Sequence, residues 1–150
     1  MLEAPPLTPG TLAPDFSLAA SNGSTVRLSA VLEQGGVVLA FYPGNHTQMC
    51  DRQLRVMKEE LDLFRAAGVT PFGVNPASAQ EHEEYAASLE LPFLLLSDPG
   101  LVVARRWQAV SPSGDQVTRT VYLVDRTGTI RFAARGMPGA DITLEAFEEA

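Results

Sequence analysis

Cys50 is the only cysteine of the chain, and it lies where an apolar segment gives way to an amphipathic one. The reactive form of cysteine is the thiolate, which the positive N-terminal end of a helix favours over the thiol. If Cys50 occupies the first turn of a helix, unpaired backbone N–H groups face its sulfur. This position indicates a nucleophilic or redox-active thiol. A mechanism that needs two cysteines of this chain is excluded.

A structural cysteine is the alternative interpretation, because free cysteine is among the most buried residue types. Cys50 shares a helical apolar stripe with Leu54 and Met57, and such a stripe normally faces a core. The stripe alone leaves both interpretations open. The residues around Cys50 favour the reactive one.

Three further residues are candidates for the same site. Thr47 could cap the helix and bond the sulfur or a bound oxygen, or it could serve as a cap alone. Pro43 could screen the site from water, or it could simply end a strand. Arg119 opens a later predicted strand; if that strand runs antiparallel, the guanidinium reaches the sheet edge of Cys50 and favours the thiolate. A solvated strand-end arginine is the alternative.

The two histidines are weaker candidates. His46 lies four residues before Cys50, and although Cys–His pairs activate nucleophiles, its place ahead of the helix favours a surface loop. His82 lies between Glu81 and Glu83, where we expect a solvated helix residue. One cysteine and two histidines without a Cys-x-x-Cys motif predict no metal site, and no glycine-rich phosphate loop is found.

The elements that would position these residues follow from the periodicity of the chain. A continuous apolar segment predicts a strand at 37–42. Further strands are predicted at 69–74, where Pro71 and Gly73 weaken the pattern, at 93–96 and at 119–124, with 129–134 as a hairpin partner. Helical spacing and capping signals predict helices over 47–68, over 77–89 after an Asn75-Pro76 start, over 98–107 and over 143–149. The prolines and the glycine within residues 1–14 predict an irregular arm that leads into the domain. The expected architecture is one α/β domain over 1–150, with a mixed central sheet and helices on both faces.

Composition narrows the function classes. The chain of 150 residues is long enough for one domain with a sizeable core. Its net charge of −7 argues against a nucleic-acid partner, because phosphate binding needs clustered Lys and Arg. No segment approaches the ~20 apolar residues of a membrane span, and no secretory signal is recognised. With no second cysteine for a disulfide, we expect a cytoplasmic protein.

The segment Pro-Gly-Asn-His-Thr-Gln-Met-Cys at 43–50 contains the pattern Pro-x-x-x-Thr-x-x-Cys and resembles the peroxiredoxin signature. Further agreement in order and spacing comes from Ala-Pro-Asp-Phe at 13–16, Leu-Leu-Ser-Asp-Pro at 95–99, and Arg119 ahead of 121–125. The resemblance covers about residues 9–135. It is closest to the branch called bacterioferritin comigratory protein or PrxQ.

This resemblance implies a thioredoxin-like fold of the AhpC/TSA type and a thiol peroxidase without a cofactor. Cys50 would be the peroxidatic cysteine, whose thiolate attacks hydrogen peroxide or an organic hydroperoxide and becomes a sulfenic acid. Thr47 and the Cys50 N–H would bond the reacting atoms, Arg119 would stabilise the thiolate and polarise the O–O bond, and Pro43 would shield the pocket.

Two departures from the family pattern concern regeneration and docking. Many proteins of this branch have a resolving cysteine five residues after the peroxidatic one, where this chain has Arg55. The sequence thus resembles a one-cysteine peroxiredoxin, which needs an external reductant: thioredoxin, glutaredoxin, a low-molecular-weight thiol, or a second subunit's Cys50. The loop at 44–46 and Gln48 also differ from the usual Lys-Asp-Phe and Pro. We hypothesise that His46 and Arg55 alter the surface where the reductant docks.

Two other functions stay open at this point. In a redox sensor, Cys50 would be oxidised and pass the change to a partner with little turnover. In a non-catalytic binding module, Cys50 would be structural; the joint presence of Pro43, Thr47, Cys50 and Arg119 argues against this. The resemblance is compatible with a monomer or a homodimer.

Overall fold

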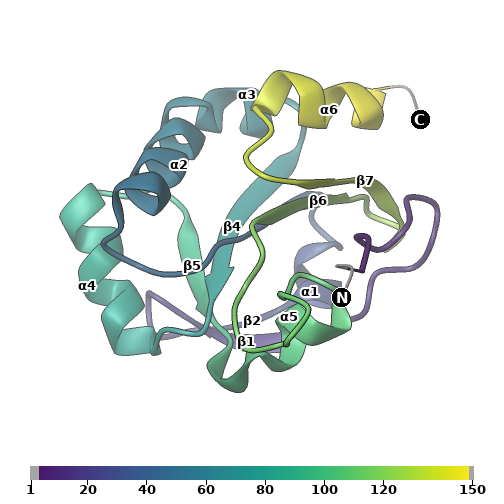
Figure 1. Cartoon of the computed structure of the whole chain (residues 1–150). Coiled ribbons are helices and arrows are strands. Elements are labelled where there is room, and N and C mark those ends of the chain that lie inside the picture. The colour runs from purple at the N-terminus through teal and green to yellow at the C-terminus, as the bar shows by residue number, and fades with distance from the viewer. Residues whose placement is uncertain (1–3, 149–150) are drawn as a thin grey trace.

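The computed structural model describes residues 4–148, in which helices surround a central sheet (Figure 1). The strands are β1 (Ser17–Ala20), β2 (Thr25–Arg27), β3 (Gly36–Phe41), β4 (Val69–Asn75), β5 (Leu94–Ser97), β6 (Thr120–Val124) and β7 (Ile130–Arg135). The helices are α1 (Leu28–Val31), α2 (Gln48–Glu59), α3 (Leu61–Ala66), α4 (Ala79–Leu89), the 3-10 turn η1 (Pro99–Leu101), α5 (Val102–Arg106) and α6 (Ala140–Glu148).

One seven-stranded sheet runs through the molecule in the order β2-β1-β5-β4-β3-β6-β7. The central strand β3 is parallel to β4 and antiparallel to β6, so the predicted mixed sheet is confirmed. Because side chains of a strand alternate between faces, β3 contributes to two cores. Val37, Leu39 and Phe41 pack with α1 and α5 residues, whereas Val38, Ala40 and Tyr42 pack with α2, α3, α4 and α6. The expected helices on both faces are therefore present.

The described N-terminal part contains elements that the prediction lacked. Between residues 15 and 34 the structure has β1, β2 and α1, where no strand or helix was expected. These elements are three or four residues long, with alternating exposed and buried positions in the strands. Segments this short give too few residues for a periodic pattern to emerge.

Helix α4 begins later than predicted. Its N-cap is Ser78, which forms a capping box with Glu81, and not Asn75. Asn75 is instead the last residue of β4, paired with Ser97 of β5, and its Oδ1 accepts a hydrogen bond from the Ala77 N–H at 2.9 Å. The additional sheet pairing thus extends the strand by one residue beyond Val74.

Other boundaries shift by a few residues. The helix predicted over 47–68 is interrupted at Glu60 and becomes α2 and α3; Gly68, with φ of +73°, follows its end as expected. Helix α6 starts at Ala140, before the predicted residue 143, and residue 149 lies outside the described residues. Within residues 4–148, no helix has the length and apolar character needed to span a membrane.

Candidate active site

Cys50 lies in the first turn of α2, directly after the carboxyl end of the buried strand β3. Thr47 is the N-cap in extended conformation, and its Oγ1 accepts a hydrogen bond from the Cys50 N–H at 3.1 Å. The predicted cap is therefore confirmed. The Cys50 N–H, which the family resemblance expects to bond a peroxide, thus donates to Thr47 in this structure. The Cys50 side chain is 1% exposed, and its apolar stripe along α2 faces the core.

Arg119 precedes β6, and the antiparallel pairing of Thr120 with Phe41 brings it to the end of β3. Its Nη2 donates to Cys50 Sγ at 3.5 Å. The structure thus brings together two residues that are 69 positions apart in the sequence. A guanidinium at this distance can donate a charge-assisted hydrogen bond to an anionic group at this position. This contact distinguishes Cys50 from an ordinary core cysteine.

Gln53 is a member of the site that the sequence analysis missed. It is 4% exposed, and its Oε1 accepts a hydrogen bond from Arg119 Nη1, so one guanidinium contacts both Gln53 and Cys50. Gln53 lies three residues after Cys50, and helical residues at that spacing share a face. The spacing of three residues from Cys50 could have placed Gln53 at the site. A single polar residue beside the apolar stripe of α2 does not by itself indicate a function.

Pro43 follows the buried strand after Tyr42, and its side chain is exposed to solvent. It ends the strand, which agrees with the simpler of its two expected roles. Screening of Cys50 by Pro43 stays a prediction.

His82 was predicted wrongly, since its side chain is fully buried instead of solvated. The buried face of α4 consists of His82, Tyr85 and Leu89, at helical spacing, while Glu81 and Glu83 lie on exposed positions. Burial lowers the pKa of His82, although Glu81 and nearby backbone groups of Asn75 and Leu96 act in the opposite direction. His46 is exposed in the loop before α2, as predicted.

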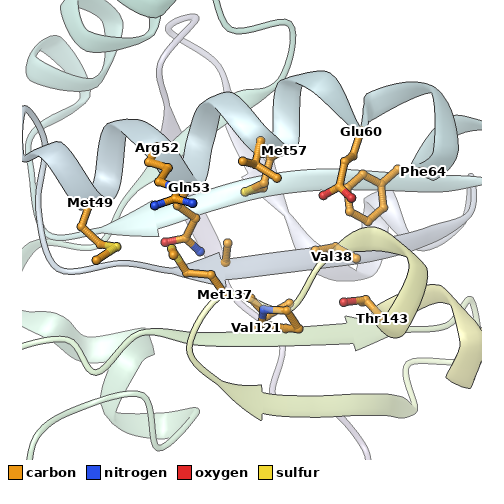
Figure 2. A pocket seen from close by; sticks show the side chains of 13 residues that line it. Val38, Met49, Arg52, Gln53, Met57, Glu60, Phe64, Val121, Met137 and Thr143 are labelled. Carbon is orange, nitrogen blue, oxygen red and sulfur yellow. The ribbon is translucent and has the colours of Figure 1, made fainter.

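A pocket of about 310 Å³ lies beside Gln53, between α2, β6 and the segment that leads into α6 (Figure 2). Figure 2 shows Gln53 extending from α2 toward Met137. The apolar lining includes Met49, Val56, Met57, Phe64, Val121 and Met137. An apolar molecule could therefore lie next to Gln53, whereas Cys50 and Arg119 are not among the lining residues. Among residues 4–148, no group of three or more His, Cys, Asp or Glu side chains is placed to hold a metal ion.

The sequence model of the AhpC/TSA family matches residues 9–133 of the chain. A chloroplastic peroxiredoxin Q of Triticum aestivum is 32% identical over 124 residues, which are 82% of this chain and 57% of the relative. A chloroplastic peroxiredoxin Q of Sedum lineare is also 32% identical, over 83% of this chain and 67% of the relative. The chain therefore spans a little over half the length of several curated relatives that it matches.

Solved structures of bacterial peroxidoxin and bacterioferritin comigratory proteins share the fold of this chain. Peroxidoxin BcpB of Mycobacterium tuberculosis superposes with a TM-score of 0.85 and 23% identity, over 94% of this chain and 96% of that one. The bacterioferritin comigratory protein of Xanthomonas campestris, described for alkyl peroxide reduction, gives a TM-score of 0.79 and 24% identity, over 89% and 90% of the two chains. The predicted thioredoxin-like fold of the peroxiredoxins is thereby confirmed.

Proposed function

Because this chain belongs to the AhpC/TSA family of peroxiredoxins, we propose that it is a thiol peroxidase acting through Cys50. Residues 1–150 would then form one thioredoxin-like domain. The observation that carries it is the 3.5 Å contact between Arg119 Nη2 and Cys50 Sγ at the start of α2. A cation and a helix N-terminus at one sulfur both favour the thiolate, which is the form that attacks peroxides.

The first chemical step is a displacement at oxygen. The Cys50 thiolate attacks the terminal oxygen of ROOH, an S–O bond forms as the O–O bond breaks, and the leaving RO⁻ takes up a proton. The products are Cys50 sulfenic acid and ROH, or water when R is hydrogen. Arg119 stabilises the negative charge as it passes from sulfur to the leaving oxygen.

Gln53 and Thr47 prepare this step. Gln53 fixes the orientation of the Arg119 guanidinium. Nη1 of the guanidinium donates to Gln53 Oε1, while its Nη2 contacts the Cys50 sulfur. The Thr47 oxygen accepts the Cys50 N–H, which leaves its hydroxyl hydrogen available for the sulfur or a peroxide oxygen. Pro43 would limit the approach of water from the loop side.

The expected substrates are hydrogen peroxide and organic hydroperoxides. The pocket beside Gln53 supports the second class, because its apolar lining could accept an alkyl chain next to Gln53, the residue that bonds Arg119. An activity of this type, the reduction of alkyl peroxides, is described for the Xanthomonas campestris relative.

Regeneration follows a one-cysteine route, since the chain contains no second thiol. An external thiol R′SH attacks the sulfenic acid and releases water, giving a mixed disulfide. A second thiol then displaces Cys50 and yields a disulfide of the reductant. Thioredoxin, glutaredoxin, a low-molecular-weight thiol and a second copy of the chain all fit this chemistry. His46 and Arg55 are exposed near Cys50 in the sequence, in keeping with a role in docking.

Intact mass spectrometry tests this proposal. Hydrogen peroxide is added stepwise to the reduced chain, candidate thiols are added next, and the mass of the chain is measured after each addition. A thiol peroxidase gains one oxygen on Cys50 and then consumes peroxide continuously with at least one reductant. Oxidation without recycling by any thiol would favour the redox sensor. If micromolar peroxide left Cys50 unmodified, the chain would be a non-catalytic member of its family.

A further inference from the structure

Arg135, the last residue of β7, binds three separate segments of the chain through one side chain. Its Nη1 donates to the Gln108 carbonyl oxygen at 2.8 Å and to Thr120 Oγ1 at 2.7 Å. Its Nη2 donates to the Ala4 carbonyl oxygen. Within residues 4–148 this guanidinium forms no salt bridge with a carboxylate. Its donors are directed at uncharged oxygens, so Arg135 holds segments in place rather than neutralising a negative charge.

Thr120 links Arg135 to the arginine of the candidate active site, because it directly follows Arg119. The Thr120 side chain is fully buried, and its hydroxyl donates to the Thr118 carbonyl oxygen at 2.8 Å while it accepts from Arg135. The Arg119 carbonyl oxygen accepts the N–H of Gly136, the residue after Arg135, at 2.8 Å. The peptide groups on both sides of Arg119 are therefore held by a residue that Arg135 either bonds or directly precedes.

Gln108 connects Arg135 to the same part of the backbone from the other side. Its φ of +54° is a left-handed conformation that is unfavourable for residues other than glycine. The next residue, Ala109, accepts the Thr118 N–H through its carbonyl oxygen at 2.8 Å. Bonds from surrounding groups maintain such a conformation, and the bond from Arg135 to the Gln108 carbonyl oxygen is one of them. Arg135 thus also fixes the segment that bonds the backbone just before Arg119.

We propose that Arg135 is a positioning residue, which fixes the start of β6 so that the Arg119 guanidinium reaches Cys50 Sγ. Arg135 acts through the backbone of Arg119, because its side chain lies on the other face of the sheet from Cys50. Side chains of a strand alternate between faces, and Ala133, two residues before Arg135, packs with the core to which Cys50 does not belong. A misplacement of about 1 Å near reacting atoms can cost up to about a hundredfold in rate. The inference rests on the proposed function, since it concerns the placement of Arg119 for that reaction.

Substitutions of two arginines on β7 test this proposal. Arg135→Met removes the donors but keeps a side chain of similar length, and Arg135→Lys keeps the charge without the planar fork. Arg131→Met is the matched control, because Arg131 is also half-buried on β7 but bonds Asp125 at 3.2 Å. For each variant, alone and combined with Arg119→Met, one measures the rate of Cys50 oxidation by stoichiometric hydrogen peroxide. The denaturant midpoint shows that each variant is folded.

We expect Arg135→Met to slow the oxidation of Cys50 by about tenfold, because the Arg119 guanidinium is displaced from the sulfur. Arg135→Lys should give an intermediate rate, and Arg131→Met should stay near the parental rate. In the Arg119→Met background, Arg135→Met should cause no further loss, since its effect passes through Arg119 alone. Equal slowing in both backgrounds, or an unchanged rate in Arg135→Met, would overturn the positioning role.

An NMR spectrum of the arginine side-chain N–H groups provides a readout that needs no peroxide. The Nε–H signal of Arg119, assigned by its absence in Arg119→Met, should move or broaden in Arg135→Met and remain in place in Arg131→Met. An unmoved signal in Arg135→Met would refute the proposal. Thr120→Val, which removes the hydroxyl that Arg135 bonds, replaces Arg135→Met if that variant folds poorly, with the same expectations. A parent chain that peroxide fails to oxidise would overturn the proposed function, whereas this spectrum would still confirm or refute the effect of Arg135 on Arg119.

Discussion

At the scale of single residues, the site depends on how one guanidinium is shared. Arg119 contacts Cys50 with one nitrogen and Gln53 with another, so the position of the cation is set from two sides. Arginine is suited to this task because its planar fork presents several donors in fixed directions. A change at Gln53 should therefore affect chemistry at a sulfur that it does not itself bond.

Gln53→Leu, which retains the approximate size but removes the acceptor, should slow the oxidation of Cys50 by about tenfold. The reason is that an unrestrained guanidinium spends less time against the sulfur. Rapid mixing with peroxide, followed by intact mass, measures this rate. Gln48→Leu is the control, because Gln48 is an exposed residue of the same helix. Equal rates in Gln53→Leu and the parent would remove Gln53 from the site.

The sequence indicates some of these residues better than others. Thr47 and Arg119 belong to a recognisable pattern, and each lies near the predicted end of an element. Gln53 and His82 lack such a signal, because each is a polar residue on a helix face that is otherwise apolar. Local spacing cannot tell whether such a residue finds a partner across the core, so the prediction of His82 as solvated was wrong.

At the scale of elements, α2 combines a cap and a nucleophile in one turn. The Thr47 oxygen accepts the Cys50 N–H, so the residue that starts the helix also restrains the cysteine backbone. A loss of this cap should affect both stability and reactivity.

Thr47→Ala should lower the free energy of unfolding by about 1 kcal/mol, the usual cost of losing an N-cap oxygen. Thr47→Ser keeps that oxygen and should remain near the parent in stability. Urea denaturation followed by circular dichroism measures both variants. A Thr47→Ser variant that lost as much stability as Thr47→Ala would show that the methyl group, not the cap, matters.

The buried face of α4 predicts a pH dependence of stability. Burial lowers the pKa of His82 in the folded state, so below about pH 6.5 the unfolded chain binds more protons than the folded one. The contribution of His82 to folding stability is therefore fully present above about pH 6.5. It is lost as the pH falls from there toward the lowered pKa of His82 in the folded state. Burial raises the pKa values of Asp15 and Asp125, but their hydrogen bonds outweigh this and leave both pKa values lowered. These two residues therefore lose their contribution to stability only as the pH falls below about 3.8.

Denaturant unfolding measured between pH 7.5 and pH 5 should accordingly show decreasing stability in the parent. His82→Leu should show a shallower decrease over the same interval. Parallel curves for the two proteins would mean that His82 does not titrate differently on folding.

At the scale of the whole molecule, the sheet separates two cores and places the site at the carboxyl end of its central strand β3. The alternating strands, the hairpin and the main helices could be predicted because their segments are long and periodic. The β1–β2 hairpin could not, because its strands are too short to show a periodic pattern. The interruption at Glu60, whose carboxylate accepts the Ala140 N–H, and the pocket beside α2 could not either, since both involve segments far apart in the sequence. The pocket in particular combines α2, β6 and the approach to α6.

This pocket predicts a difference between substrates. Met137→Glu places a charge at the 40% exposed rim residue and should slow reaction with cumene hydroperoxide several-fold, while hydrogen peroxide reacts at the parental rate. Ile142→Glu is the control, because Ile142 is exposed on α6 and does not line the pocket. Equal effects of Met137→Glu on both peroxides would assign the pocket no part in substrate choice.

The most direct test of peroxidase chemistry at Cys50 is the rate at which stoichiometric hydrogen peroxide oxidises it, with and without Arg119. We expect rapid addition of one oxygen to Cys50 in the parent and a rate about a hundredfold lower in Arg119→Met, because one charged donor at the reacting atoms is lost. Arg106→Met, which changes an exposed arginine outside the site, should react like the parent. Equal rates in the parent and in Arg119→Met, or a Cys50 that stoichiometric peroxide leaves reduced, would contradict the account.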